Sequence, residues 1–151
     1  MVIKTSKFRS YLTAQIVLAA IGALMLVFMD FGGYYYRDGY NHIDVWGYVY
    51  FGSGMIPTAL IFLGFGGLAI AFSNAIRILK KNEMSVKEIK ERLRLSKHGA
   101  MFTAVLAGVG AIVFIATNLE IDWWLNGGFY GAFLGGLLIT VVIKLMGEHI
   151  K

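Results

Sequence analysis

The chain has 151 residues, of which 58% are hydrophobic and only 15% are charged, and its mean hydropathy is +0.67. A soluble domain of this size carries about a quarter charged residues, so the composition argues against a soluble domain and indicates a membrane protein. The formal net charge is +5 and the sequence has no cysteine, which excludes disulfides, thiol redox chemistry and a thiolate metal site.

Four apolar stretches are long enough to cross the hydrocarbon core of a bilayer, which takes about 20 residues at 1.5 Å per residue. These stretches are residues 11–28, 55–79, 99–119 and 129–146. The first follows three basic residues but is longer than the apolar core of a signal peptide, so we expect it to be retained as a span. The sequence therefore predicts one all-α integral membrane domain over residues 1–151, with four transmembrane helices.

The basic residues predict the orientation of these spans. Of the 14 Lys and Arg residues, only Arg37 falls in the segments between spans one and two or between spans three and four. Because cytoplasmic loops carry an excess of Lys and Arg, we expect both termini and the loop 80–98 to be cytoplasmic, with the loops 30–54 and 120–128 outside. The expected location is the plasma membrane of a prokaryote, with anionic lipids rather than nucleic acid at the basic face.

The first outer loop, residues 30–54, is rich in Gly and Tyr and has turn signals at Gly32-Gly33 and Asp38-Gly39. Residues 48–51, Tyr-Val-Tyr-Phe, have strand-forming side chains, but one short strand does not make a sheet alone. We therefore expect a compact cap that rests partly on the membrane, or an interfacial helical turn.

The three tryptophans, Trp46, Trp123 and Trp124, all fall at the outer ends of predicted spans. This placement is typical of an interfacial aromatic belt, because the indole ring prefers the membrane boundary while its N–H reaches water. An aromatic cage for a cationic ligand is the alternative.

A short pattern, Ile-Asp-x-Trp, occurs at 43–46 and again at 121–124. We expect Asp44 and Asp122 to cap the N-termini of the second and fourth spans, and the tryptophans that follow to fix the depth of those helices. The same pattern raises the possibility of two repeated helical hairpins.

The cytoplasmic loop contains a helix signal. Ser85 and Glu88 form a capping box, and Val86, Ile89 and Leu93 recur at helical spacing. The pattern predicts a short amphipathic helix over residues 86–95, with its apolar stripe toward the bilayer or the spans; docking of a partner protein is the alternative. Its basic residues, expected to face lipid headgroups and water, are Lys87, Lys90, Arg92 and Arg94.

The spans are almost free of ionisable residues, which argues against proton-coupled transport and against a voltage sensor. Gln15 and Thr103 are expected to make hydrogen bonds between helices. Small residues recur at four-residue spacing instead, and in lipid such residues let helix backbones approach closely. The predicted helix-packing residues are Gly127, Gly131, Gly135, Ala100, Ala104, Gly108, Gly67 and Ala71.

A metal site on the outer face is a further candidate, since imidazole and carboxylate groups bind divalent ions. Its candidate ligands are His42, Asp44, Glu120 and Asp122. The sequence contains no Gly-rich phosphate loop, nucleophile elbow or paired-His motif, so catalysis is unsupported and no cofactor is expected.

These observations favour a non-catalytic tetraspan protein that acts through helix packing. It would be a subunit of a larger membrane complex or a homo-oligomer. A channel with an acidic outer vestibule and an outer-face metal enzyme remain as alternatives.

Overall fold

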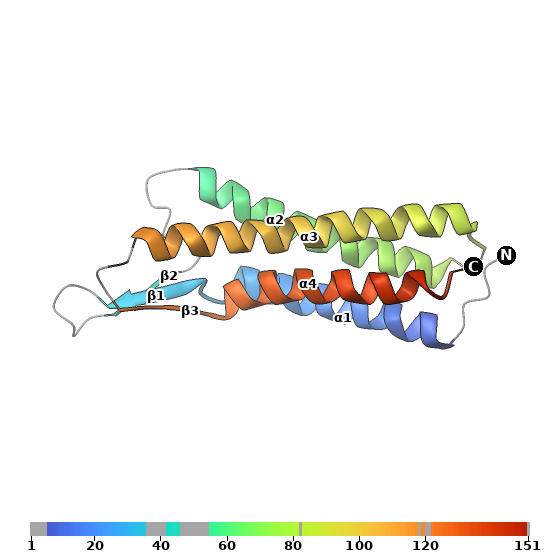
Figure 1. The fold of residues 1–151 in the computed structure, drawn as a ribbon, viewed down its shortest axis with the longest axis horizontal. Helices are drawn as coiled ribbons and strands as arrows, with labels where there is room; N and C mark the ends of the chain where they lie inside the picture. The colour runs from blue at the N-terminus through green and yellow to red at the C-terminus, as the bar shows by residue number, and fades with distance from the viewer. Residues whose placement is uncertain are drawn as a thin grey trace.

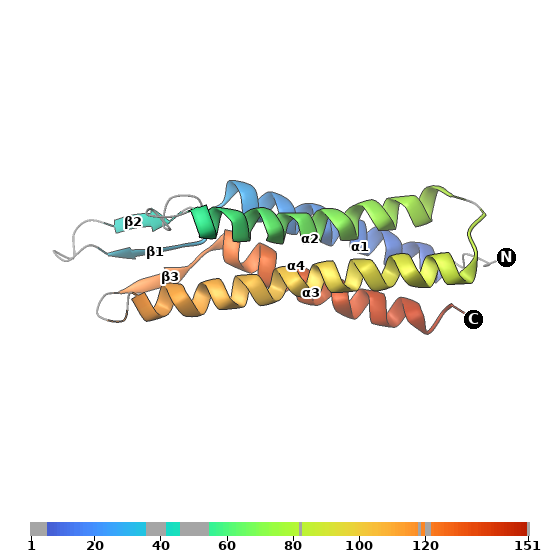
Figure 2. The ribbon, with the colours of Figure 1, turned by 90° about the horizontal axis from the view of Figure 1, so that it is seen from above.

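The computed structural model describes residues 6–35, 42–45, 55–81, 83–117, 119 and 122–150. Four long helices lie side by side in an elongated bundle, with a small β-sheet at one end (Figures 1 and 2). The helices are α1 (Ser6–Phe28), α2 (Met55–Lys80), α3 (Val86–Thr117) and α4 (Gly127–Gly147). We call the two ends of the bundle the sheet end and the basic end. The basic end holds the start of α1, the end of α4 and the connection from α2 to α3 (Figure 1).

Each of the four helices contains a segment that is long and apolar enough to cross a membrane. The prediction of four helices that are long and apolar enough to span a membrane is therefore confirmed. The helices run past the predicted spans at the basic end, since α1 begins at Ser6 and α2 continues to Lys80.

The prediction of a separate amphipathic helix over 86–95 is wrong, because α3 is one continuous helix from Val86 to Thr117. Its start is as expected: the Ser85 hydroxyl oxygen accepts a hydrogen bond of 3.1 Å from the Glu88 N–H. Continuity has a physical reason, since the apolar stripe at Ile89 and Leu93 is buried in the same core as the spans. The 32 residues of α3 extend over about 48 Å, which exceeds the hydrocarbon thickness.

The helices pack as a ring, in which α1 contacts α2 and α4, and α3 contacts the same two helices. Two apolar clusters fill the interior. The cluster nearer the basic end includes Phe8, Leu12, Ile89, Ile139 and Met146. The cluster at the sheet end includes Leu26, Phe31, Ala111, Phe114 and Phe129.

Large apolar side chains also cover the outside of the bundle. A water-soluble bundle would not expose so many of them together, whereas lipid tails solvate them. Examples on successive helices are Val17, Ile21, Phe62, Ile70, Val105, Val109, Leu134 and Leu138. This belt agrees with the membrane class that the composition indicates.

A three-stranded antiparallel sheet caps the sheet end, in the order β2-β1-β3. The strands are β1 (Gly32–Tyr35), β2 (His42–Val45) and β3 (Trp123–Leu125). The expected compact cap therefore contains a sheet, which the sequence did not predict, and the described part of the first loop holds strands rather than a helical turn. The first loop forms two of the strands, and the second loop supplies the third. Residues 48–51 lie outside the described residues.

Candidate functional site

The two aspartates of the Ile-Asp-x-Trp pattern do not cap helices. Asp44 lies within β2, opposite Gly33. Asp122 precedes β3, and its backbone carbonyl accepts a hydrogen bond of 3.0 Å from the Tyr35 N–H. Strand β3 stands between Asp122 and α4, and the N-cap of α4 is Asn126, whose side chain accepts from the Gly127 N–H at 2.9 Å. The capping prediction is wrong for this reason.

The metal candidates do not form a centre in the part of the chain that the structure describes. No group of three or more His, Asp or Glu side chains there could hold a metal ion. Asp122 is exposed. Glu120 lies outside the described residues, and so does Trp46.

The two tryptophans of β3 have different surroundings. Trp123 is 37% exposed. Its position at a membrane interface stays a prediction. Trp124 faces Gly33 across the β1–β3 pair, and a Cβ built at Gly33 would lie 2.6 Å from Trp124 Cε2. The Trp124 ring also meets Tyr35 edge to face, with ring centroids 5.4 Å apart. Trp124 therefore packs within the cap.

The first turn of α4 is tied to the end of α1. The Asn126 N–H donates to the Phe31 carbonyl and the Gly128 N–H to the Asp30 carbonyl, both at 2.9 Å. A Cβ at Gly128 would lie 2.8 Å from the Met29 carbonyl oxygen, so a side chain there would push the two segments apart. The cap and the helices are thus joined at this point.

The glycines of α4 face two different helices. A Cβ built at Gly22 of α1 would lie 2.7 Å from the Gly131 carbonyl oxygen, and Gly135 lies beside the same Gly22. On another side of α4, a Cβ at Gly136 would lie 3.0 Å from Ala104 Cβ on α3. The small residues therefore allow close packing of α4 inside its own chain.

A second close approach joins α2 and α3. A Cβ at Gly99 would lie 2.7 Å from the Gly67 carbonyl oxygen. Thr103, one turn further along α3, donates a hydrogen bond of 2.6 Å to the Gly64 carbonyl. Gly108 has more room, since a Cβ there would lie 3.5 Å from Phe133. Gly22 and Gly99 were not among the helix-packing residues predicted from the sequence.

Apart from the partly covered Arg92, the polar side chains in the described interior are neutral. The fully or nearly buried ones are Gln15, Asn74, Ser96 and Thr103. Gln15 Nε2 donates to the Ala71 carbonyl at 2.8 Å, so the expected interhelical hydrogen bonds of Gln15 and Thr103 are confirmed. The Gln15 Oε1 and Ser96 Oγ atoms have no protein partner.

Arg92 departs from the expected headgroup-facing position. Its guanidinium donates to Asn74 Oδ1 at 3.2 Å and pairs with Glu88 at 3.4 Å, and its side chain is largely covered. Lys81, after the end of α2, pairs with the same Glu88 at 3.5 Å. Arg92 therefore links α2 to α3 and is not free to meet lipid.

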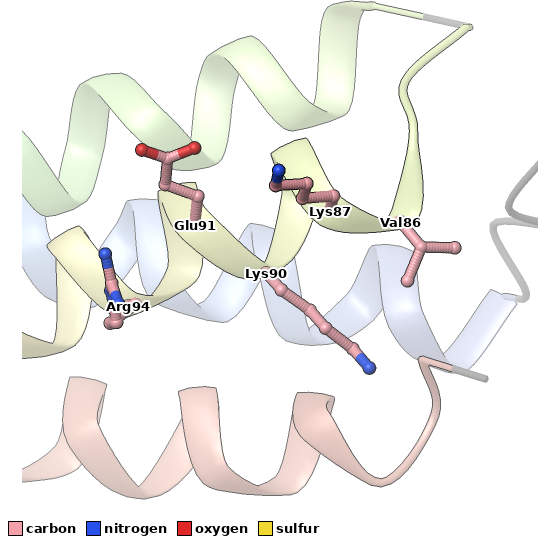
Figure 3. A pocket seen from close by; sticks show the side chains of 5 residues that line it. All are labelled: Val86, Lys87, Lys90, Glu91 and Arg94. Atoms are coloured by element: carbon pink, nitrogen blue, oxygen red, sulfur yellow. The ribbon is translucent and has the colours of Figure 1, made fainter.

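A groove of about 640 Å³ lies on the first turns of α3 (Figure 3). Its lining residues are Val86, Lys87, Lys90, Glu91 and Arg94. Three of the four predicted basic residues of this segment thus share one concave surface. The charged members are exposed, in contrast to Arg92.

No protein-family model, no curated protein and no solved structure matches this chain.

Proposed function

We propose that this chain is a non-catalytic membrane protein that acts by assembly, as a subunit of a larger membrane complex or as a homo-oligomer. In this proposal the basic end lies in the cytoplasm and the sheet end outside, as the distribution of Lys and Arg favours. The observation that carries the proposal is the interior of the bundle, where the buried polar side chains of the described residues are all uncharged.

That interior offers little for transport or catalysis. Proton-coupled transporters and pumps use ionisable side chains inside the bundle, where the proton or ion is held. The described helices meet instead through backbone contacts such as Gly22 with Gly131 and Gly67 with Gly99. Because these contacts close the bundle, a pore of the kind considered above would have to form between several chains.

The outward face of α2 is the surface that we propose for assembly. The small residues of α4 and α3 are used within the chain, whereas a Cβ built at Gly66 would have open space around it, with no described atom beyond its own helix backbone and chain neighbours within 4 Å. Phe65 and Ile70 are exposed beside it, and Ser73 is exposed on the next turn. A glycine between bulky apolar side chains lets a partner helix approach, and an outward serine in a span gains from a polar partner.

Single-cysteine cross-linking tests this surface cleanly, because the chain has no cysteine of its own. Ile70→Cys on α2 is compared with Val109→Cys on α3 and Leu138→Cys on α4; all three side chains are 48% exposed. In native membranes treated with an oxidant or a short bis-maleimide, we expect a cross-linked product from Ile70→Cys and little from the other two.

The mass of that product separates the two forms of assembly. A doubled chain mass indicates a homo-oligomer, and any other mass indicates a different subunit. Mass measurement in mild detergent and in nanodiscs gives an independent reading. A monomer in both media, with no cross-link from Ile70→Cys above the two controls, would overturn the assembly proposal.

A further inference from the structure

The basic groove lies where α3 leaves the apolar belt. On the outer surface of α3 the continuous run of exposed apolar side chains begins at Met101 and Phe102 and continues through Val105 and Val109. Arg94 lies two helical turns before Met101, or about 10 Å along the axis. The headgroup layer of a bilayer extends about 5–8 Å beyond the hydrocarbon on each side. A side chain as long as arginine at this position reaches that layer.

The cations of the groove approach one volume from different directions. In the view of Figure 3, Lys90 extends to the α4 side of α3, whereas Lys87 and Glu91 extend to the α2 side. Lys87, Lys90 and Arg94 are three or four residues apart, so they occupy the same side of the helix. The groove therefore offers an anion three cations from one face of α3.

The charge of the groove is not cancelled locally. Glu91 is its only acidic lining residue, against three cations. The neighbouring acid, Glu88, already pairs with Arg92 at 3.4 Å and with Lys81 at 3.5 Å. An excess of positive charge thus remains in a concave surface next to the membrane boundary, where an anionic headgroup is the nearest complementary group.

We propose that this groove binds the headgroup of an anionic phospholipid that also carries a hydroxyl, such as phosphatidylglycerol. Lys90 and Arg94 donate to the phosphate, and Lys87 adds a third positive charge at the rim. Glu91 accepts a hydrogen bond from the headgroup hydroxyl, which a phosphodiester without a hydroxylated headgroup does not offer. The acyl chains follow the same face of α3 along Met101 and Val105. The inference rests on the membrane insertion assumed above, but not on the assembly through α2.

The position of the groove favours a lipid headgroup over a free phosphate as the bound anion. A free phosphate would interact with the three cations but would gain nothing from the apolar residues from Met101 onward. A lipid engages both the charged and the apolar part of the same helix face. The site is therefore assigned to a lipid, and small anions serve as competitors in the test.

The experiment uses the full chain in a mild neutral detergent, titrated with phosphatidylglycerol and followed by native mass spectrometry. The test variant is Lys90→Gln/Arg94→Gln. The matched control is Arg77→Gln/Lys80→Gln, which removes two exposed cations from α2 at the same end of the bundle. Circular dichroism checks that both variants keep their helices.

We expect the test variant to lose affinity for phosphatidylglycerol on the order of 25-fold, since each basic residue near an anionic surface contributes about fivefold. The control should lose clearly less affinity, because Arg77 and Lys80 do not line the groove. Phosphatidylcholine should bind no better to the wild type than to the test variant. Equal loss in the test and control variants would overturn the site, because binding would then follow net charge alone.

Two further binding measurements identify the ligand. Phosphatidylmethanol has the same charge as phosphatidylglycerol but no headgroup hydroxyl, so the wild type should prefer phosphatidylglycerol and Glu91→Ala should lose that preference. Inorganic phosphate at millimolar concentration should not displace the lipid. If it displaces the lipid fully, the groove is a small-anion site and the lipid assignment is wrong. Neither measurement depends on cross-linking through Ile70, so the two proposals fail separately.

Discussion

Trp124 packs its indole ring over Gly33, the residue directly opposite it in the β1–β3 pair. The two residues belong to different loops of the chain, and their contact holds those loops together. A Cβ at Gly33 would lie 2.9 Å from Trp124 Nε1, so the ring occupies the space that a side chain would need. This close contact with the Trp124 ring explains why residue 33 is a glycine.

Replacing Gly33 with valine should displace the Trp124 ring and destabilise the cap. Forcing extra carbon atoms into a packed site costs about 1–3 kcal/mol. We expect a lower thermal midpoint in detergent and a shift of tryptophan fluorescence. Gly147→Val, at a glycine with open space around it and away from the proposed assembly surface, is the control for introducing a β-branched residue. Identical fluorescence and identical midpoints for Gly33→Val and wild type would contradict the contact.

Gly131→Leu and Gly66→Leu should separate folding from assembly. The first places a large side chain against Gly22 and Met25 of α1, and we expect a destabilisation of about 3 kcal/mol or more, beyond ordinary overpacking. The second adds the same side chain on the outward face of α2, and should leave the thermal midpoint of the monomer unchanged while weakening the assembly. Thermal unfolding and native mass measured on the same samples provide both readings. Loss of fold in Gly66→Leu would show that this surface is not free.

Asn126→Ala should cost more stability than Asp122→Ala. The Asn126 side chain caps α4 at 2.9 Å from the Gly127 nitrogen, and the loss of such a cap costs about 1 kcal/mol. The Asp122 side chain is exposed, and the hydrogen bond to Tyr35 uses its backbone carbonyl, which alanine retains. Chemical or thermal unfolding in detergent compares the two. A larger loss of stability in Asp122→Ala than in Asn126→Ala would contradict the assignment of Asn126 as the cap of α4.

Gln15→Leu should be close to neutral, despite the complete burial of Gln15. Its Nε2 donates to the Ala71 carbonyl, but its Oε1 has no protein partner. A hydrogen bond between helices in a membrane averages about 0.6 kcal/mol, and leucine removes the unpartnered oxygen at similar volume. Unfolding in detergent should show a change within about 1 kcal/mol of zero. A large loss would show that Oε1 has a bound water or another partner.

The span count could be read from the sequence because one solvent, the lipid, acts on every helix in the same way. Local signals worked too: Ser85 marks the start of α3, and Gln15 and Thr103 stand out as polar residues in apolar runs. The sheet could not be predicted, since β1 finds β3 only through the pairing of residues about 90 positions apart. The same strand made the Asp122 capping prediction fail, although Asn126 before Gly127 was itself a readable cap signal.

The central strand β1 follows α1 directly, whereas its neighbour β3 directly precedes α4, the last helix. During synthesis the second edge of β1 therefore stays unpaired until almost the whole chain has been made. The same applies to the part of the Gly22 face of α1 that packs against Gly131 and Gly135 of α4. A chain in which the fourth helix fails to insert thus keeps an open strand edge on one side of the membrane and a bare small-residue face within it. The sheet can therefore be completed only after all four helices have been inserted.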